Sequence, residues 1–476
     1  MKILPLDAAG GRTSGALREF LGRCRSAAAE AGRPRLVSIS LGVDALDPLA
    51  VLESIFEPTE LHFYVERPGE GMAVAGAEAA AVFTAEGPGR FTAVRRFIDE
   101  TLAEAVAVGD LSVPFSGPHF FSAFAFSERV EPGEPFPSAT VFVPRWQVAH
   151  VRGRTVAVAN LQVDGDSPVE ALADRVWRAH AKFRAFDYAE PAFPEGAGTP
   201  PTSVSEVGPP GGFARAVAEA LDGIAGGSFE KIVLARAKDL SAPGILHPLR
   251  VLNGLRQRFS DCYAFSVANG RGQSFIGASP ERLVRVEAGG LTTEALAGSA
   301  PRGASASEDA AFAAALLRDD KELREHRLVL DFIVGRLRSL GLKPEHPDRP
   351  SVRKFANVQH LHTPVRAGVP ASVSLPEVLA CLCPTPAVGG VPRDAAVARI
   401  RGLEGFPRGL YAGALGWFDP RGGGEFFVGL RSALIDGARA RLYAGAGIVA
   451  GSSSDREIAE TEMKFGAMQE ALLPGF

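Results

Sequence analysis

Two pairs of glutamates, far apart in the chain, have the spacing needed to help bind a divalent cation. Glu322 and Glu325 lie in the segment KELREH, and Glu457 and Glu460 lie in REIAETEMK. Residues at positions i and i+3 share one face of a helix, so each pair places two carboxylates side by side. Like charges disfavour mutual ionisation, and a site with only oxygen ligands suits Mg²⁺. A magnesium site therefore forms if the two helices face each other, which the sequence alone does not show.

Each pair is also compatible with an ordinary solvated helix face. The C-terminal pair follows a short apolar run, 443–447, then a Gly/Ser segment, and Asp455 begins the helical stretch. This order predicts a strand, a turn and an N-capped helix. Glycines at the strand end offer backbone N–H groups to an anion. Taken alone, the segment favours the solvated face, because Lys464 follows Glu460 at the spacing of a stabilising surface pair.

Composition excludes several classes of protein. The chain has 476 residues and a formal net charge of −4, which argues against general affinity for nucleic acid or for an anionic membrane surface. No apolar run reaches the ~18 residues of a spanning helix, and the N-terminus has too short an apolar core for a signal peptide. The 4 cysteines form neither a disulfide framework nor a zinc pattern. We therefore expect a reduced, cytoplasmic enzyme that is a monomer.

Hydrophobic patterning predicts an α+β fold with sheets packed under helices. Residues 90–108 and 307–340 are expected to form long helices, the second of which carries Glu322 and Glu325. Short β-type runs surround them in both halves of the chain. One such run begins at Lys231, directly after a Gly-Gly pair. Strands outnumber helices, which is typical of sheets covered by a few long helices.

The clearest boundary lies in the middle of the chain. Residues 189–212 are rich in Pro, Gly, Ser and Thr, a composition typical of a flexible linker or loop. They separate an N-terminal half, 1–188, from a C-terminal region, 213–476. We find no catalytic motif in the N-terminal half, so the chemistry is predicted for the C-terminal region.

A series of motifs in the C-terminal region occurs in the order and spacing of a known family. The motifs are FEKIVLAR (229–236), GASPERL (277–283), TEALAGSAPRG (293–303), KELREH (321–326), VQHLHTPV (358–365), PTPAVGG (384–390), RGLYAGALGW (408–417), VGLRSALI (428–435) and AGAGIVAGSSSD…ETEMK (444–464). This region resembles the chorismate-binding enzymes, which comprise isochorismate, salicylate, anthranilate and aminodeoxychorismate synthases. The resemblance implies one large α+β domain, with β-sheets packed in a sandwich and helices on the outside.

The resemblance also implies which residues change bonds. Lys231 stands where members that use water have their general base, while members that use ammonia have glutamine. A lysine can act in this way when burial favours its neutral form. Glu281 matches the general acid that protonates the departing C4 hydroxyl. The resemblance therefore implies an acid and a base on opposite sides of the substrate ring.

Other matched positions would hold the substrate chorismate and Mg²⁺. Glu325 and Glu460 match direct metal ligands, and Glu322 and Glu457 match residues that bind the metal directly or through water. Arg431 matches the residue that clamps the pyruvyl carboxylate, a task suited to a planar guanidinium. The remaining positions that the resemblance assigns to substrate binding are Ala297, Gly298, Ser299, His360, Ala387, Tyr411, Gly445, Gly447 and Lys464. We interpret His326 and His362 as structural.

Within the family, Lys231 and Ala387 favour an isochorismate synthase, an isomerase that adds water at C2 of chorismate as the C4 hydroxyl departs. A salicylate synthase, which goes on to eliminate pyruvate, is the nearer alternative. A subunit that depends on an amidotransferase partner is the other. Cys383 stands where many relatives have histidine, and we assign it no mechanistic role. Whether the product serves menaquinone or siderophore biosynthesis is left open by the sequence.

Overall fold

The structure is a computed structural model that describes residues 1–4, 14–184, 186, 188, 203–356 and 358–472. Its helical segments are α1 (Ser14–Ala31), α2 (Pro48–Ser54), η1 (Pro68–Glu70), α3 (Arg90–Ala103), α4 (Val169–Arg184), α5 (Gly212–Ala225), α6 (Pro248–Arg258), α7 (Ala306–Leu316), α8 (Asp320–Ser339), α9 (Leu375–Leu382), α10 (Arg393–Glu404) and α11 (Ser454–Leu472). Among the described residues, no helix combines the length and the apolar character needed to cross a membrane.

The strands fall into two groups along the chain. Those of the N-terminal half are β1 (Lys2–Leu4), β2 (Arg35–Val43), β3 (Leu61–Arg67), β4 (Met72–Ala85), β5 (Val106–Val108), β6 (Phe120–Phe124), β7 (Ala139–Val151) and β8 (Arg154–Val163). Those that follow are β9 (Ser203–Glu206), β10 (Lys231–Ser241), β11 (Tyr263–Asn269), β12 (Gln273–Ser279), β13 (Arg282–Glu287), β14 (Gly290–Pro301), β15 (Ser351–Lys354), β16 (Val358–Gly368), β17 (Gly390–Val391), β18 (Ala414–Phe418), β19 (Gly424–Val428), β20 (Ser432–Asp436) and β21 (Arg439–Val449).

Hydrogen bonding joins the strands of both halves into one sheet. An antiparallel path runs β16-β14-β13-β19-β18 and continues through β6, β7, β4 and β3 to β11, β12, β20, β21 and β10. The two crossings between halves are the pairs β6–β18 and β3–β11. The N-terminal half therefore completes the sheet that carries the C-terminal motifs.

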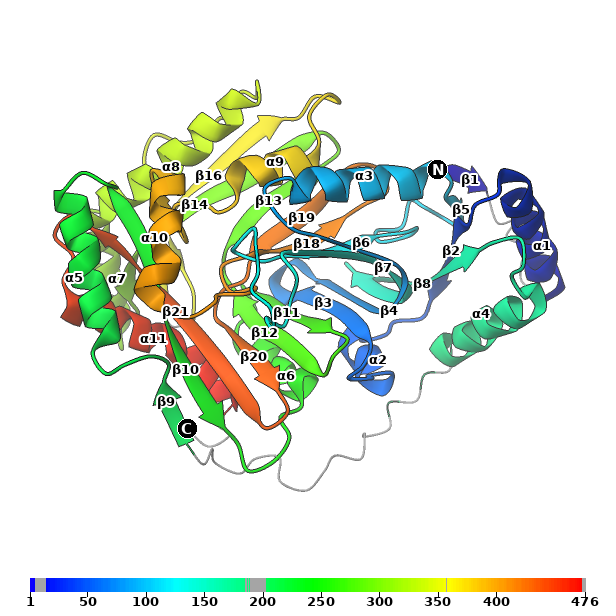
Figure 1. Cartoon of the computed structure of the whole chain (residues 1–476), viewed down its shortest axis with the longest axis horizontal. Coiled ribbons are helices and arrows are strands. Elements are labelled where there is room, and N and C mark those ends of the chain that lie inside the picture. Colours follow the sequence, from blue (N-terminus) through cyan, green and yellow to red (C-terminus); the bar gives the residue numbers. More distant parts are fainter. Residues whose placement is uncertain (5–13, 185, 187, 189–202, 357, 473–476) are drawn as a thin grey trace.

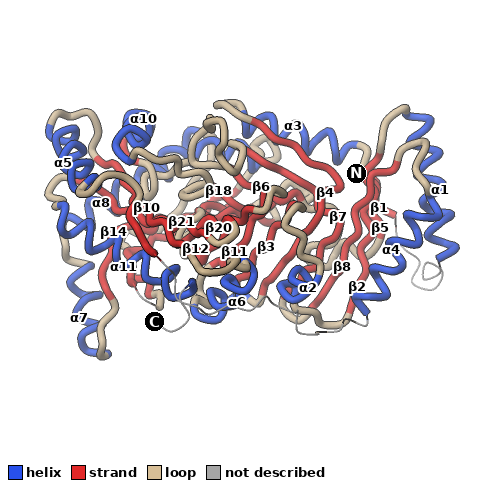
Figure 2. Tube along the Cα trace, turned by 60° about the horizontal axis from the view of Figure 1, so that its bottom comes forward, coloured by secondary structure: helices blue, strands red, loops and turns tan. Residues whose placement is uncertain are grey.

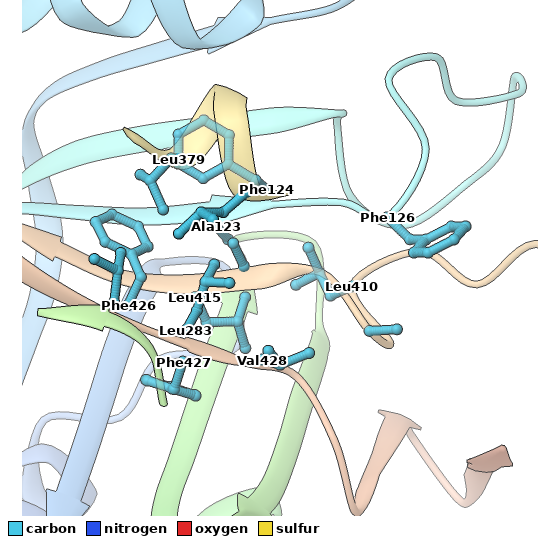
Figure 3. Close-up of a cluster of buried hydrophobic side chains, with 14 of the residues drawn as sticks. Ala123, Phe124, Phe126, Leu283, Leu379, Leu410, Leu415, Phe426, Phe427 and Val428 are labelled. Atoms are coloured by element: carbon cyan, nitrogen blue, oxygen red, sulfur yellow. The ribbon is translucent and has the colours of Figure 1, made fainter. Parts of the chain in front are cut away.

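This sheet folds back on itself, so its inner faces pack against each other as in a sandwich. Phe63 of β3 stacks on Phe121 of β6 with ring centroids 4.8 Å apart, although these strands are not neighbours in the ladder. Tyr263 of β11 stacks in the same way on Phe427 of β19, at 4.8 Å. Buried aromatic and aliphatic side chains fill the space between, as the cluster around Phe124 and Phe426 shows (Figure 3). Burial of these apolar surfaces is the main force that holds the layers together.

Helices cover the outside of the sheet, which confirms the predicted α+β fold. In Figures 1 and 2, α5, α8, α10 and α11 surround β10, β14 and β21 at one end, while α1 and α4 cover β2 and β8 at the other. Helix α8 buries one stripe of side chains at helical spacing against β14 and β16: Glu322, His326, Val329, Leu330, Ile333, Val334 and Leu337. The first two are polar, and they contact β14 and β16: Glu322 accepts from the Ser299 N–H, and His326 lies beside Thr363.

Local predictions were wrong at two helix boundaries. The predicted helix 307–340 is divided into α7 and α8, because Asp319 caps a new helix by accepting bonds from the backbone N–H groups of Lys321 and Glu322. The predicted helix 90–108 ends at Ala103, and its last residues form β5 between β1 and β2. Of the predicted linker, residues 189–202 lie outside the described part, and Ser203–Glu206 form β9 beside β10.

Candidate active site

A cavity of about 80 Å³ lies where β14, β16 and β21 meet α8 and α11. The predicted site residues on its wall are Glu281, Ala297, Gly298, Ser299, Glu325, His360, Ala387, Tyr411, Arg431, Gly445, Gly447, Glu460 and Lys464. Sequence reasoning missed Val233, Pro280, Leu296, Val388, Leu430, Tyr443 and Ala444, mostly apolar residues that also line it. Elements from most of the C-terminal region thus bring these predicted residues to one place, whereas Lys231, Glu322 and Glu457 do not line the cavity.

Lys231 lies behind this wall and is fully buried at the start of β10. Its Nζ is 2.9 Å from Oε1 of Glu325, close enough for an ion pair although the atoms are not aligned as a hydrogen bond. Gly447 separates Lys231 from the cavity: a Cβ there would collide with Glu325 Oε1 and lie 3.2 Å from Lys231 Cε. Only glycine leaves the lysine this close to the cavity.

Glu281 faces the cavity from the turn between β12 and β13 and is only 5% exposed. Its backbone is held on both sides, since its N–H donates to Ser279 Oγ at 3.3 Å and its carbonyl accepts from Val428 N at 3.1 Å. Burial raises the pKa of Glu281 to about 8, the Glu294 carboxylate adds to the rise, and Lys231 and Lys464 oppose it. At neutral pH this side chain is a protonated acid that can donate a proton.

Donors for carboxylate groups gather in another part of the wall. Burial lowers the pKa of Arg431, and burial raises the pKa of Tyr411 to about 12, so Tyr411 stays a neutral donor. Lys464 Nζ donates to the Gly445 carbonyl at 2.9 Å and to Glu460 Oε1 at 2.6 Å. Gly445 is required here, because a Cβ would lie 2.8 Å from the Tyr411 hydroxyl oxygen. A cationic and hydroxyl-rich surface of this kind suits an anionic ligand.

A bulge in β14 positions the loop that was predicted to approach the substrate. The register of β14 against β16 shifts between Ala297 and Ser299, and Gly298 has a φ of 80°, which favours glycine. Ser299 Oγ lies 3.0 Å from His360 Nδ1. Burial lowers the pKa of His360 to about 3, so this imidazole is neutral. The bulge also points the Ser299 N–H at Glu322 Oε2, at 2.9 Å.

The two glutamate pairs do face each other across α8 and α11. Burial raises the pKa of Glu322, and the neighbouring Glu325 and Glu460 charges add to the rise. Burial also raises the pKa of Glu457. Lys321, which sequence reasoning missed, joins the pairs: its Nζ is 3.2 Å from Glu457 Oε1 and 3.4 Å from Glu322 Oε1. Its position directly before Glu322 in the sequence is the only signal that could have indicated it.

The donor set fits a hard divalent cation in chemistry, since it consists of oxygen atoms on carboxylates that repel one another. Their arrangement is that of ion pairs: Glu325 with Lys231, Glu460 with Lys464, and Glu322 and Glu457 with Lys321. In the described part of the chain, no three acidic, histidine or cysteine side chains are placed to hold a metal together. In this structure each of the four carboxylates lies within 3.4 Å of a lysine Nζ.

The two histidines that we interpreted as structural have structural partners. His326 lies with Nδ1 3.3 Å from the Ala297 carbonyl and Nε2 2.8 Å from Thr363 Oγ1. His362 Nε2 is 2.9 Å from Glu294 Oε2, which also accepts a 2.8 Å bond from Arg353. The carboxylate of Glu294, missed from the sequence, is therefore held in place near Glu281.

Comparison with known proteins shows what the chain is similar to. The family model described as "Chorismate binding enzyme" matches residues 20–473. The salicylate biosynthesis isochorismate synthase of Pseudomonas aeruginosa is 35% identical over 96% of this chain and 94% of that protein. Isochorismate synthase MenF of Bacillus subtilis is 31% identical over 94% of this chain and 95% of that protein. The solved structure of the menaquinone-specific isochorismate synthase MenF from Escherichia coli superposes with a TM-score of 0.77 at 28% identity, covering 97% of this chain and 100% of that one.

Proposed function

Because this chain belongs to the chorismate-binding enzyme family, we propose that it is an isochorismate synthase, an isomerase that converts chorismate to isochorismate. The observation that carries the proposal is that a buried lysine lies behind the wall of the same cavity that a protonated glutamic acid lines. Lys231 lies against Glu325 behind Gly447, and Glu281 carries a pKa of about 8 on the cavity wall. A lysine at position 231 favours water as the nucleophile over ammonia. The names of the relatives from Pseudomonas aeruginosa and Bacillus subtilis support the same activity.

In the proposed reaction, Lys231 acts as its neutral amine and removes a proton from a water molecule, whose oxygen bonds to C2 of the substrate ring. The ring double bonds shift, and the bond between C4 and its hydroxyl breaks. Glu281 gives its proton to the departing hydroxyl, which leaves as water. One water enters and one leaves, so the net change is an isomerisation. The reverse reaction uses the same two groups with their roles exchanged, so the conversion is reversible.

The remaining wall residues bind and orient the substrate. Arg431, Tyr411 and Lys464 would donate to its carboxylates, and the bare backbone at Gly445 and Gly447 lets the ligand approach β21. Ser299 and neutral His360 would flank the ring from the β14 bulge. Because these groups are fixed by strands and by α11, little conformational freedom has to be lost when the ligand binds.

We further propose that the enzyme uses Mg²⁺, held directly by Glu325 and Glu460 and directly or through water by Glu322 and Glu457. When bound, Mg²⁺ would neutralise the charge of a substrate carboxylate beside these glutamates. The support is the donor chemistry: four carboxylates on two facing helices, of which Glu325 and Glu460 line the cavity. Their lysine partners would have to release the carboxylates for the ion to bind.

The test is to incubate the purified chain with chorismate, with and without Mg²⁺, and to resolve the products by chromatography. Isochorismate alone, formed without glutamine or ammonia, is the expected product. Salicylate and pyruvate as direct products would instead assign a salicylate synthase. A need for glutamine and a partner protein would assign the amidotransferase-dependent alternative.

The role of Lys231 is tested by Lys231→Ala with Lys238→Ala as the matched control on the same strand. Lys238 pairs with Glu462 at 2.6 Å and does not line the cavity. We expect Lys231→Ala to bind chorismate in calorimetry yet lose turnover, and Lys238→Ala to retain both. Full turnover in Lys231→Ala would remove this lysine from the mechanism.

A further inference from the structure

A second, smaller cavity lies beside the active site at the beginning of α3. Its volume is about 10 Å³, room for a single particle about the size of a water molecule. Its apolar wall includes Phe124, Phe126, Leu283 and Val428, which form part of the cluster in Figure 3. Val388 lines both this cavity and the active site. An occupant would therefore lie one side chain away from the proposed substrate.

Three polar side chains line this otherwise apolar cavity, and the first is a buried cation. Arg90 is 5% exposed, its Nη2 donates to the Ala125 carbonyl at 3.2 Å, and its Nε has no hydrogen-bond partner among the described residues. Burial lowers its pKa, and the groups that oppose this are Cys383 and Glu128. Glu128 is exposed and, in the described structure, acts on Arg90 only through its charge, without a hydrogen bond between the two side chains. A guanidinium that is mostly buried, with an unpartnered Nε, is costly, so a negative charge beside it would stabilise the site.

The other two polar groups are hydrogen-bond donors, which also favour a negatively charged occupant. Thr385 is 4% exposed, and its Oγ1 has no partner among the described residues. Burial raises the pKa of Cys383 to about 12, so at neutral pH its thiol is protonated and can donate. Arg90 is also the first residue of α3; its own N–H donates to the Gly87 carbonyl at 3.2 Å, and the cap residue Gly89 supplies no side-chain acceptor for the N–H groups that follow.

We propose that Arg90, Thr385 and Cys383 form a binding site for a small monatomic anion, chloride, with bromide as its slightly larger substitute. A water molecule would fill the space but would leave the guanidinium charge unbalanced. An anion accepts from the arginine Nε–H, the threonine hydroxyl and the thiol, and neutralises the charge as well. A halide has no proton to donate and needs no acceptor, which matches a wall whose free polar groups can all donate.

The site would also stabilise the segment that borders the active site. The Thr385 carbonyl accepts from Val388 N at 3.1 Å and from Gly389 N at 2.8 Å, closing a turn around Ala387. Arg393 donates to the Cys383 carbonyl at 3.1 Å from the other side. An anion on Thr385 would therefore fix the turn that presents Ala387 and Val388 to the substrate cavity.

The experiment is thermal unfolding of the full chain at constant ionic strength while sodium gluconate is replaced by sodium chloride or bromide. The variants are Arg90→Met and Thr385→Val, with Arg96→Met as a matched control, because Arg96 lies on α3 with an 81% exposed side chain. We expect the unfolding midpoint of the wild type and of Arg96→Met to rise with halide concentration. Thr385→Val should need about tenfold more halide for the same rise. Arg90→Met should show no halide-dependent rise.

Bromide also allows a direct test by its anomalous scattering in crystals grown from sodium bromide. A peak in the cavity between Arg90 and Thr385 is expected in the wild type. Equal midpoints in gluconate and halide, or a halide response that Thr385→Val leaves unchanged, would overturn the proposal. Should Arg90→Met fail to fold, Thr385→Val and the anomalous map decide the question. Ordered water alone at this position in the bromide crystals would also overturn it.

Discussion

The raised pKa of Glu281 leads to a prediction about how folding stability changes with pH, which can be tested without measuring activity. The folded protein holds this carboxyl at a pKa of about 8, against an ordinary value of 4.5, because burial disfavours its charged form. Where the folded-state pKa is the higher one, the folded state binds the proton more tightly. The resulting stability is fully present below pH 4.5 and is lost as pH rises toward 8.

Glu281→Gln removes this ionisation and keeps the size and polarity of the neutral acid. At pH 5 the variant should unfold with nearly the same free energy as the wild type. At pH 8 the variant should be more stable than the wild type by about 4 kcal/mol. The pKa differs between the folded and unfolded states by roughly three and a half units, each worth about 1.4 kcal/mol, and the folded acid is half ionised at this pH.

The assay is urea unfolding at pH 5, 6.5 and 8, with Glu287→Gln as a control at an exposed carboxylate of the adjoining strand. The control should follow the wild type at each pH. Glu281→Gln should also lose isochorismate formation, so that stability increases while activity falls. If the wild type and Glu281→Gln keep a constant difference from pH 5 to pH 8, the carboxyl is ionised in the folded state and our assignment of it as the acid is wrong.

Three further changes test the surrounding wall. Lys321→Met removes the cation between Glu322 and Glu457; it should destabilise the metal-free protein by about 3 kcal/mol in urea unfolding and tighten Mg²⁺ binding in calorimetry. Unchanged Mg²⁺ affinity would argue that the lysine does not compete with the ion. Gly447→Ala should disturb the Lys231–Glu325 pair, lower kcat at least tenfold and reduce the free energy of unfolding by about 1–3 kcal/mol. Wild-type kinetics in this variant would show that the β21 backbone shifts readily to accommodate the methyl group. Arg431→Lys should raise KM for chorismate about tenfold or more with little change in Tm, since an ammonium cannot clamp a carboxylate bidentately; an unchanged KM would place that carboxylate elsewhere.

The spacing of residues in the sequence correctly predicted features that depend on helix geometry alone. Glu322 and Glu325 share a face of α8 because the helix repeat places them there, and the same holds for Glu457 and Glu460 on α11. The order of motifs and the resemblance that they carry predicted the family and the fold class, which the comparisons confirm. The same motifs named residues that line one cavity, although their roles remain proposals.

Contacts between distant segments were beyond the reach of such reasoning. The pairing of Lys231 with Glu325 depends on how α8 packs against β21, the neighbour of β10, and no local rule relates those positions. Nothing in the sequence assigned a role to Lys321 of KELREH, because its contact with Glu457 depends on the packing of α11. The break between α7 and α8 was missed because the helical pattern continues through it and only the Asp319 cap interrupts the helix.

The two strand pairs that connect the halves have a consequence for any attempt to isolate a minimal enzyme. Residues 213–476 alone would lack β3 and β6, leaving the facing edges of β11 and β18 with unpaired backbone groups. Phe126, just past β6, donates its N–H to the Gly409 carbonyl at 2.9 Å, so the segment leading to Tyr411 would lose a support as well. Open strand edges of this kind recruit other chains. A fragment of residues 213–476 should therefore aggregate through edge-to-edge pairing, because the N-terminal half covers these edges in the full chain.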